Sequence, residues 1–270
     1  MKLAFSTLGC PGWPFEEIFS TAKDLGLDGI EIRGIGSEMF APQAKPFLPE
    51  NIEATIQRFH KAGMQIPMLT SGAVLGNKAK AADAVAEAKS YINLAHKLGT
   101  KYVRVMITAV PQPTDDADME TARLAYEELC SYGEERSVTP LIETNGPFAS
   151  SAAMKAFMEN IESANKGVLW DIHHPYRFFD ESPAQTYANI GPWVRYTHVK
   201  DSVMVDGTVI YRMMGYGDVP IFDTLKILND NGYDGFVTLE WVKRWCPDLQ
   251  EPGIVFSHFT SYMNFLLRQL

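Results

Sequence analysis

Several features are missing from the sequence, and each absence excludes a class of protein. No apolar run approaches the roughly 20 residues that a membrane-spanning helix needs. The opening residues 1–17 reach Gly, Pro and Glu too soon for the apolar core of a secretory signal. Cys10, Cys130 and Cys246 are odd in number and widely scattered, which argues against a disulfide framework and against a CxxC metal site. We therefore expect a cytoplasmic protein without a membrane partner.

Positive charge is also scarce. Lysine and arginine together number 24 against 33 acidic residues, the formal net charge is −9, and no basic stripe interrupts this balance. Sequence-independent binding to nucleic-acid phosphates would act against that field. We therefore expect no nucleic-acid partner.

No linker, low-complexity tract or shift of composition divides the 270 residues. The sequence thus predicts a single domain over residues 1–270, a length that is normal for an α/β barrel. A GxGxxG pattern is absent after the first predicted strand, which weakens a dinucleotide-binding interpretation. No other glycine-rich phosphate loop is evident, which favours an unphosphorylated substrate.

What the chain does contain is a repeating unit of strand and helix. Between the short β-rich runs lie segments with helical periodicity; in residues 14–26 the apolar side chains recur at spacings of three and four. The β-rich runs number eight and cover residues 3–8, 29–34, 65–70, 102–108, 140–145, 168–173, 195–201 and 236–241.

Four of the helical segments end in the same way. Gly26, Gly63, Gly99 and Gly232 each stand just past the last helical turn, and the next β-rich run starts a few residues later. Glycine adopts the left-handed conformation that closes a helix end. Eight strands that alternate with helices in a chain of this length predict a closed (β/α)8 TIM barrel.

Polar side chains gather at the ends of the predicted strands, where barrel enzymes have their active sites. Converging carboxylates in a poorly hydrated interior would repel one another unless a cation were shared among them. Glu143, Asp171, His198 and Glu240 offer three oxygens and one nitrogen, a set that favours Mn²⁺ or Mg²⁺ and permits Co²⁺ or Zn²⁺. The alternative is that each is an ordinary rim group in a salt bridge with an arginine or lysine.

The order and spacing of six motifs resemble one known family. The stretches are IEIR, LIETN, WDIHH, THVKD, RMMGYGDVPIFDTLKIL and GYDGFVTLEW. The likeness extends from the first strand to the eighth. They are similar to the sugar phosphate isomerase/epimerase family, the xylose isomerase-like TIM barrels that include ketose 3-epimerases, hydroxypyruvate isomerases and inosose dehydratases. The resemblance implies that Glu143, Asp171, His198 and Glu240 bind one divalent ion, that His174 touches the substrate, and that Arg212 lies over the site.

The activity that follows is isomerisation or epimerisation of a small sugar or polyol, as part of carbohydrate metabolism. A metal that chelates a carbonyl and its neighbouring hydroxyl stabilises the enediolate that proton removal creates. Glu143 and Glu240, from strands separated around the barrel, are the expected catalytic acid and base. If a β-hydroxyl leaves instead, the same residues would serve a dehydratase acting on an inosose-like or dehydroshikimate-like substrate.

A third interpretation is a nuclease similar to endonuclease IV, a distant relative of this family. That reaction requires further histidine ligands for a zinc cluster. His60 and His96 fall inside helical patterns just before their terminal glycines, where an imidazole interacts with the helix dipole. The nuclease therefore lacks both its ligands and a favourable charge.

Three further residues are candidates for substrate binding. Trp13 stands after the first strand and either stacks on a sugar or covers the barrel mouth, while Arg33 at the second strand end is placed for a carboxylate or phosphate. Lys200, just after His198, orients that histidine, contacts substrate oxygens or forms a rim salt bridge.

Two longer segments lie outside the repeating unit. Residues 199–211 exceed the spacing found in the epimerases and predict a β-hairpin that turns at Asp206 and Gly207. The aromatic and Met-rich residues 256–270 predict a final helix that packs on the barrel and is a possible surface for a homo-oligomer.

Overall fold

The computed structural model describes all residues, 1–270. Contacts along the chain group it into two compact units, one formed by Met1–Pro67 with Thr197–Leu270 and the other by Met68–Tyr196. The single domain over 1–270 stays a prediction.

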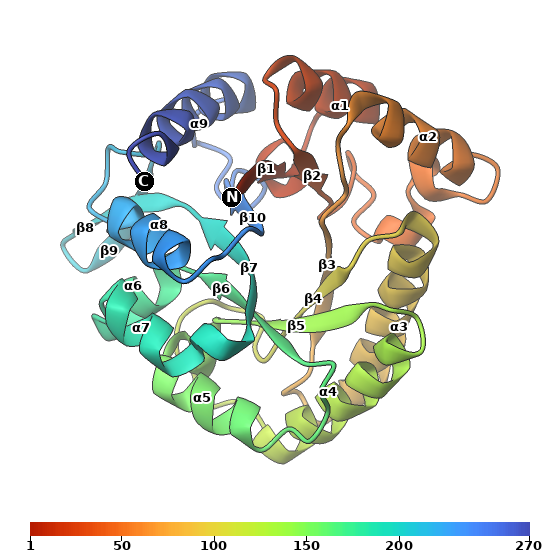
Figure 1. Cartoon of the computed structure of the whole chain (residues 1–270). Helices are drawn as coiled ribbons and strands as arrows, with labels where there is room; N and C mark the ends of the chain where they lie inside the picture. The colour runs from red at the N-terminus through yellow and green to blue at the C-terminus, as the bar shows by residue number, and fades with distance from the viewer. The chain divides into compact units, whose positions relative to one another are not determined.

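The Met68–Tyr196 unit alternates strands with helices. Its parallel strands follow the order β6-β5-β4-β3, and α3, α4 and α5 lie on the same side of them (Figure 1). The strands are β3 (Met68–Val74), β4 (Tyr102–Met106), β5 (Thr139–Glu143) and β6 (Gly167–Asp171). The helices are α3 (Ala81–Leu98), α4 (Met119–Glu134), α5 (Ser151–Glu159), α6 (His173–Phe179) and α7 (Pro183–Ile190).

The other unit is built from both ends of the chain. β1 is hydrogen-bonded to β2 on one side and to β10 on the other, and β10 also pairs with β7, all in parallel. The strands are β1 (Lys2–Ser6), β2 (Gly29–Glu31), β10 (Phe236–Leu239), β7 (Val194–Val199) and the antiparallel pair β8 (Asp201–Val205) and β9 (Thr208–Arg212). The first three residues of β7 belong to the Met68–Tyr196 unit. The helices are α1 (Phe15–Asp24), α2 (Ile52–Ala62), α8 (Ile221–Asp230) and α9 (Pro252–Leu267).

Eight parallel strands alternating with helices are thus confirmed. The strands are buried almost throughout, as expected where helices cover a parallel sheet. Gly26, Gly63, Gly99 and Gly232 all have φ between 68° and 72°, which confirms the predicted helix endings.

Every predicted strand differs from the observed one at one end or both, and two of these differences lie near a proline. The third strand starts at Met68 rather than at residue 65, since Pro67 has no N–H to give to a ladder. The sixth ends at Asp171, because His173 begins the helix α6. Pro175 therefore lies in the first turn of a helix, where its missing N–H costs nothing, and not at the end of a strand.

The predicted hairpin is confirmed. Asp206 and Gly207 connect β8 to β9 with φ of 49° and 75°. Two central residues with positive φ are the requirement for the tight turn that matches the twist of a hairpin. The insertion between His198 and Arg212 is therefore a two-stranded ribbon.

The C-terminal helix packs as predicted. The ring of Phe256 in α9 stacks on Phe5 of β1 with the centroids 4.0 Å apart. Such a stacked pair stabilises by about 0.5–1.5 kcal/mol beyond the area it buries. None of the helices combines the length and the apolar character needed to cross a bilayer.

Candidate functional site

His198 is held by a carboxylate that the sequence analysis did not assign to the site. Its Nε2 lies 2.7 Å from Oε2 of Glu31, which ends β2, and both side chains are completely buried. Because a carboxylate accepts, Nε2 carries the proton that it donates. In the neutral ring this leaves the lone pair on Nδ1.

Glu240 stands directly after β10, on the same edge of the sheet as His198. Its Oε1 is 3.4 Å from His198 Nδ1, and its Oε2 accepts a hydrogen bond of 2.5 Å from Lys200 Nζ. Nδ1 of His198 and Oε1 of Glu240 are thus two buried hydrogen-bond acceptors that face each other. Two acceptors repel each other unless a cation lies between them, so these residues fit a metal ion.

Glu143 has a comparable cation beside it in the Met68–Tyr196 unit. It ends β5, and its Oε2 accepts from Nη1 of Arg104 on β4 at 2.8 Å. Arg104 in turn donates from Nη2 to the carbonyl of Ser71 at 2.8 Å. The two side chains are only 6% and 2% exposed, so the pair is a buried one. Each of the two glutamates expected to transfer protons therefore has one oxygen on a buried cation.

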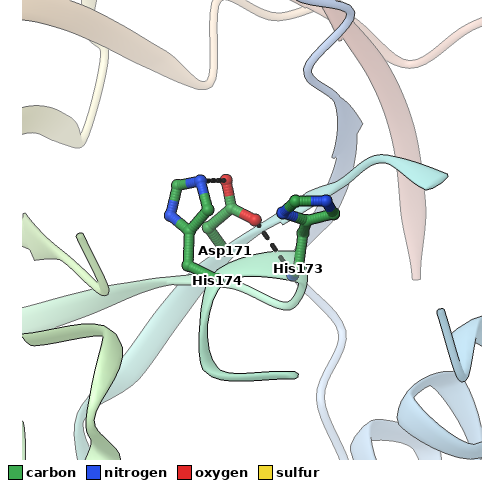
Figure 2. Close-up of side chains that lie close together, drawn as sticks. All are labelled: Asp171, His173 and His174. Carbon is green, nitrogen blue, oxygen red and sulfur yellow. Dashed lines mark hydrogen bonds and ion pairs between the residues drawn. The ribbon is translucent and has the colours of Figure 1, made fainter. Parts of the chain in front are cut away.

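Asp171, at the end of β6, forms a compact group with the two histidines that follow it (Figure 2). One ligand atom from each of Asp171, His173 and His174 lies within 4.8 Å of the others, and all three side chains are buried. Asp171 Oδ1 accepts from the backbone N–H of His173 at 3.0 Å, and Oδ2 lies 3.5 Å from His174 Nε2. His174 thus places a ring nitrogen beside the carboxylate, and His173 places its backbone N–H there.

The tautomer of His174 follows from its second ring nitrogen. Nδ1 lies 2.9 Å from the carbonyl oxygen of Thr144 and must donate to it. In the neutral ring Nε2 is then an acceptor, able to receive a proton from a hydroxyl group. The hydroxyl of Thr144 also accepts a hydrogen bond of 2.9 Å from the backbone N–H of Asp171. The loop after β5 thus positions both residues.

The remaining predicted residues lie at strand ends of the other unit. Trp13 is half-buried and meets the Phe256 ring edge-on at 5.7 Å, and Arg33 follows β2 with its backbone N–H on Thr7 Oγ1 at 2.8 Å. Arg212 ends β9 opposite Asp201. The Asp201 carboxylate accepts the backbone N–H groups of Ser202, Gly215, Gly217 and Val219, and so shapes the loop after Arg212.

Sequence reasoning missed one functional candidate, Glu31. It could have been found as the acid that closes a buried strand in the stretch IEIR. The four proposed ligands are divided between the units: Glu143 and Asp171 belong to Met68–Tyr196, and His198 and Glu240 to the other.

Comparison with known proteins gives concordant matches. A model of the family described as "Xylose isomerase-like TIM barrel" matches residues 19–255. The fructoselysine 3-epimerase of Shigella flexneri is 26% identical over 266 residues, which cover 94% of each chain.

Solved structures share the fold at lower identity. A probable 3-DHS dehydratase, AsbF of Bacillus anthracis, has a TM-score of 0.79 with 15% identity and covers 98% of this chain and 99% of its own. The IOLI protein, crystallised with a zinc atom, has a TM-score of 0.81 with 14% identity and covers 100% and 99%. These matches confirm the predicted (β/α)8 fold and the resemblance stated from the motifs. The chain belongs to the xylose isomerase-like TIM barrel family.

Proposed function

We propose that the protein is a divalent-metal-dependent epimerase or isomerase of a small sugar or polyol. The observation that carries the proposal is the orientation of His198. Glu31 accepts the hydrogen bond that Nε2–H of His198 donates and so leaves the Nδ1 lone pair beside Oε1 of Glu240, 3.4 Å away. An imidazole lone pair beside a carboxylate oxygen is a metal-binding arrangement in which a second carboxylate orients the histidine.

The proposed ligands are Glu143, Asp171, His198 and Glu240. Their exposed fractions are 1%, 0%, 0% and 8%. Arg104 and Lys200 each supply a positive charge to one oxygen of Glu143 and Glu240, and a metal ion would be the cation for the remaining ligand atoms. Oxygen-rich sets with one imidazole favour Mn²⁺ or Mg²⁺, and Co²⁺ or Zn²⁺ also fit.

The ion, when bound, would polarise a substrate carbonyl together with its neighbouring hydroxyl and so acidify the adjacent C–H. Glu143 and Glu240 are the proposed acid and base: one carboxylate removes the carbon-bound proton, and the other returns a proton. Arg104 and Lys200 each hold one oxygen of these carboxylates and thereby set the direction in which the other oxygen points. His174 accepts a substrate hydroxyl on Nε2.

Trp13, Arg33, Lys200 and Arg212 are proposed to complete the substrate site from the ends of their strands. A ketose is the favoured substrate class, because the curated relative that spans nearly the whole chain is a fructoselysine 3-epimerase. Inversion at a carbon next to a ketone needs proton removal from one face and proton return to the other, a task for two carboxylates.

Dehydration is the competing reaction on the same residues, and it would follow if a β-hydroxyl left after proton removal. The two are separated by product mass, because only the dehydratase loses water. Cytoplasmic location and assembly into a homo-oligomer remain predictions.

The first test is the metal content of the purified protein by elemental mass spectrometry. Wild type should carry about one Mn, Mg, Co or Zn ion per chain, and Glu240→Gln and His198→Ala should lose or loosen it. The matched controls are Glu50→Gln and His60→Ala, which change exposed residues of the same kinds. Absence of metal after reconstitution would contradict the proposal, and three zinc ions would favour the nuclease.

The second test follows the carbon-bound proton. Ketoses are incubated with the metal-loaded protein in D₂O, and deuterium at the carbon next to the carbonyl is measured by NMR. Glu143→Gln and Glu240→Gln should each reduce exchange by at least about 10²-fold. Exchange at the wild-type rate in both variants would exclude them as the acid and base.

A further inference from the structure

Arg244 connects three loops at the carboxyl ends of parallel strands. It lies four residues after Glu240 in the loop that follows β10. Its backbone N–H donates to the carbonyl of Leu8, in the loop after β1, at 3.3 Å. Its Nη2 donates to the carbonyl of Gly36, in the loop after β2, at 2.8 Å. The guanidinium is therefore on the same edge of the strands as Glu240.

The guanidinium is short of partners for its degree of burial. Of its five N–H donors, the protein uses the one on Gly36, and Nε is buried without any hydrogen-bond partner. No carboxylate lies within ion-pairing distance, although Arg104 and Arg58 each have one. Burial lowers the pKa of Arg244, the direction expected for a desolvated cation without an anion.

The neighbouring cation has a different, fully structural task. Lys243 Nζ donates to the carbonyls of Pro247 and Leu249 at 3.0 and 2.5 Å and pairs with Glu251 at 3.0 Å. Lys243 thus stabilises the loop after β10 through contacts with other residues of that loop. Arg244 is not needed for that, and a partly desolvated charge without a partner is costly to keep.

We propose that Arg244 binds an anionic group of the substrate, a carboxylate or a phosphate, and so determines specificity for acidic sugars. The planar fork of a guanidinium matches either group through two parallel hydrogen bonds. This role would narrow the expected substrates to sugar acids, sugar phosphates and ketoses joined to an amino acid. This inference rests on the proposed function, because it places the anion on the substrate of that site.

Anion binding is tested without turnover. Thermal unfolding of the metal-loaded protein is followed against inorganic phosphate and, separately, acetate, with chloride holding the ionic strength constant. Wild type should be stabilised in a saturable way by at least one of the two anions, which identifies the source. Arg244→Met should abolish the effect, and Arg268→Met, which removes an exposed arginine, should leave it unchanged. Equal responses of all three proteins, as with an adventitious ion, would overturn the proposal.

A second variant guards against misfolding. Arg244→Lys keeps the charge but loses the fork, and it should raise the half-saturating anion concentration about tenfold. An unchanged concentration would count against the proposal even if the Met variant did not fold.

Substrate preference is then measured by proton exchange with matched pairs. D-fructose is compared with D-fructose 6-phosphate, and fructoselysine with its carboxamide. Arg244→Met should lower kcat/KM for the preferred member that carries the phosphate or carboxylate by about 10–100-fold and change the member that lacks this group by less than about threefold. If Arg244 binds an anion but no ketose exchanges its proton, the result would contradict the proposed function and not the anion-binding role of Arg244. Equal exchange of the substrates with and without the phosphate or carboxylate would contradict this inference but not the proposed function.

Discussion

Glu31 and His198 are 167 residues apart in the sequence and share a 2.7 Å contact between Oε2 and Nε2 in a fully buried position. The contact joins the end of β2 to β7, although the strands β1 and β10 separate them in the sheet. Glu31 therefore acts on the proposed metal site through another residue, by fixing the ring of His198.

Glu31→Gln should weaken metal binding by about 10–100-fold, because the amide no longer enforces the tautomer that leaves the Nδ1 lone pair available. Competition with a fluorescent chelator measures the affinity. Glu16→Gln, on the surface beside Arg58, is the control and should bind metal as wild type does. Unaltered affinity in Glu31→Gln would remove the positioning role.

Arg104→Met should destabilise the protein by about 3–5 kcal/mol, because it leaves the Glu143 carboxylate buried without this partner. Arg123→Met breaks ion pairs with Glu120 and Glu127 on the exposed face of α4 and should cost less than about 1 kcal/mol. Urea unfolding of the two variants in parallel measures the difference. An equal loss of unfolding free energy in the two variants would mean that water screens the Arg104–Glu143 pair as it screens the surface pairs.

Gly217→Ala should disturb the loop after Arg212. A Cβ at this position would collide with Asp201 Oδ1 and with the carbonyl of Ser202. We expect a loss of about 1–3 kcal/mol of stability and a lower kcat/KM, because Arg212 is the residue from which the loop starts.

The matched control for that change is Gly253→Ala. A Cβ there meets nothing within 4 Å at the start of α9, so the variant should be neutral or stabilised by up to about 1 kcal/mol. Circular dichroism on heating gives the stability of both variants. A fully active Gly217→Ala would show that the turn around Asp201 does not position Arg212.

The three thiols should differ in reactivity. Burial raises the pKa of Cys130 to about 12 and raises that of the buried Cys10 as well, whereas Cys246 is only half-buried with a pKa raised by desolvation. A raised pKa keeps a thiol protonated and unreactive at pH 8. Iodoacetamide followed by peptide mass spectrometry should find Cys246 modified first.

The rate at Cys246 should increase as the pH rises above 8, because more of the thiolate forms. In urea all three cysteines should react at similar rates. Early modification of Cys10 or Cys130 in the native protein would contradict the burial that raises their pKa values.

The repeating architecture was readable from the sequence because its signals are local. A glycine such as Gly63 ends a helix through its own backbone, and strand ends such as that before Glu143 are marked by a polar residue after an apolar run. The hairpin at Asp206 and Gly207 was likewise local. The fold could therefore be predicted down to the alternation of strands and helices.

The errors and omissions come from interactions between distant residues. The sequence gives no sign that Glu31 meets His198, since neither residue specifies its partner. Helix α6 was missed because Pro175 fits both a strand end and the first turn of a helix. The sequence does not distinguish the roles of the neighbouring cations Lys243 and Arg244. Only the structure shows that Lys243 donates to carbonyls of its own loop and stabilises that loop, whereas the Arg244 side chain does not.

The division of the chain has a consequence for biosynthesis. The Met68–Tyr196 unit is continuous, so all its strands and helices have been synthesised before residue 197 is joined. The other unit must wait, because β1 pairs with β10 through partners such as Leu3 and Val237. A nascent chain whose residue 196 has left the ribosome would therefore already contain Glu143 and Asp171 in a unit able to compact. His198 and Glu240 are synthesised last, so the proposed ligand set is complete only near the end of translation.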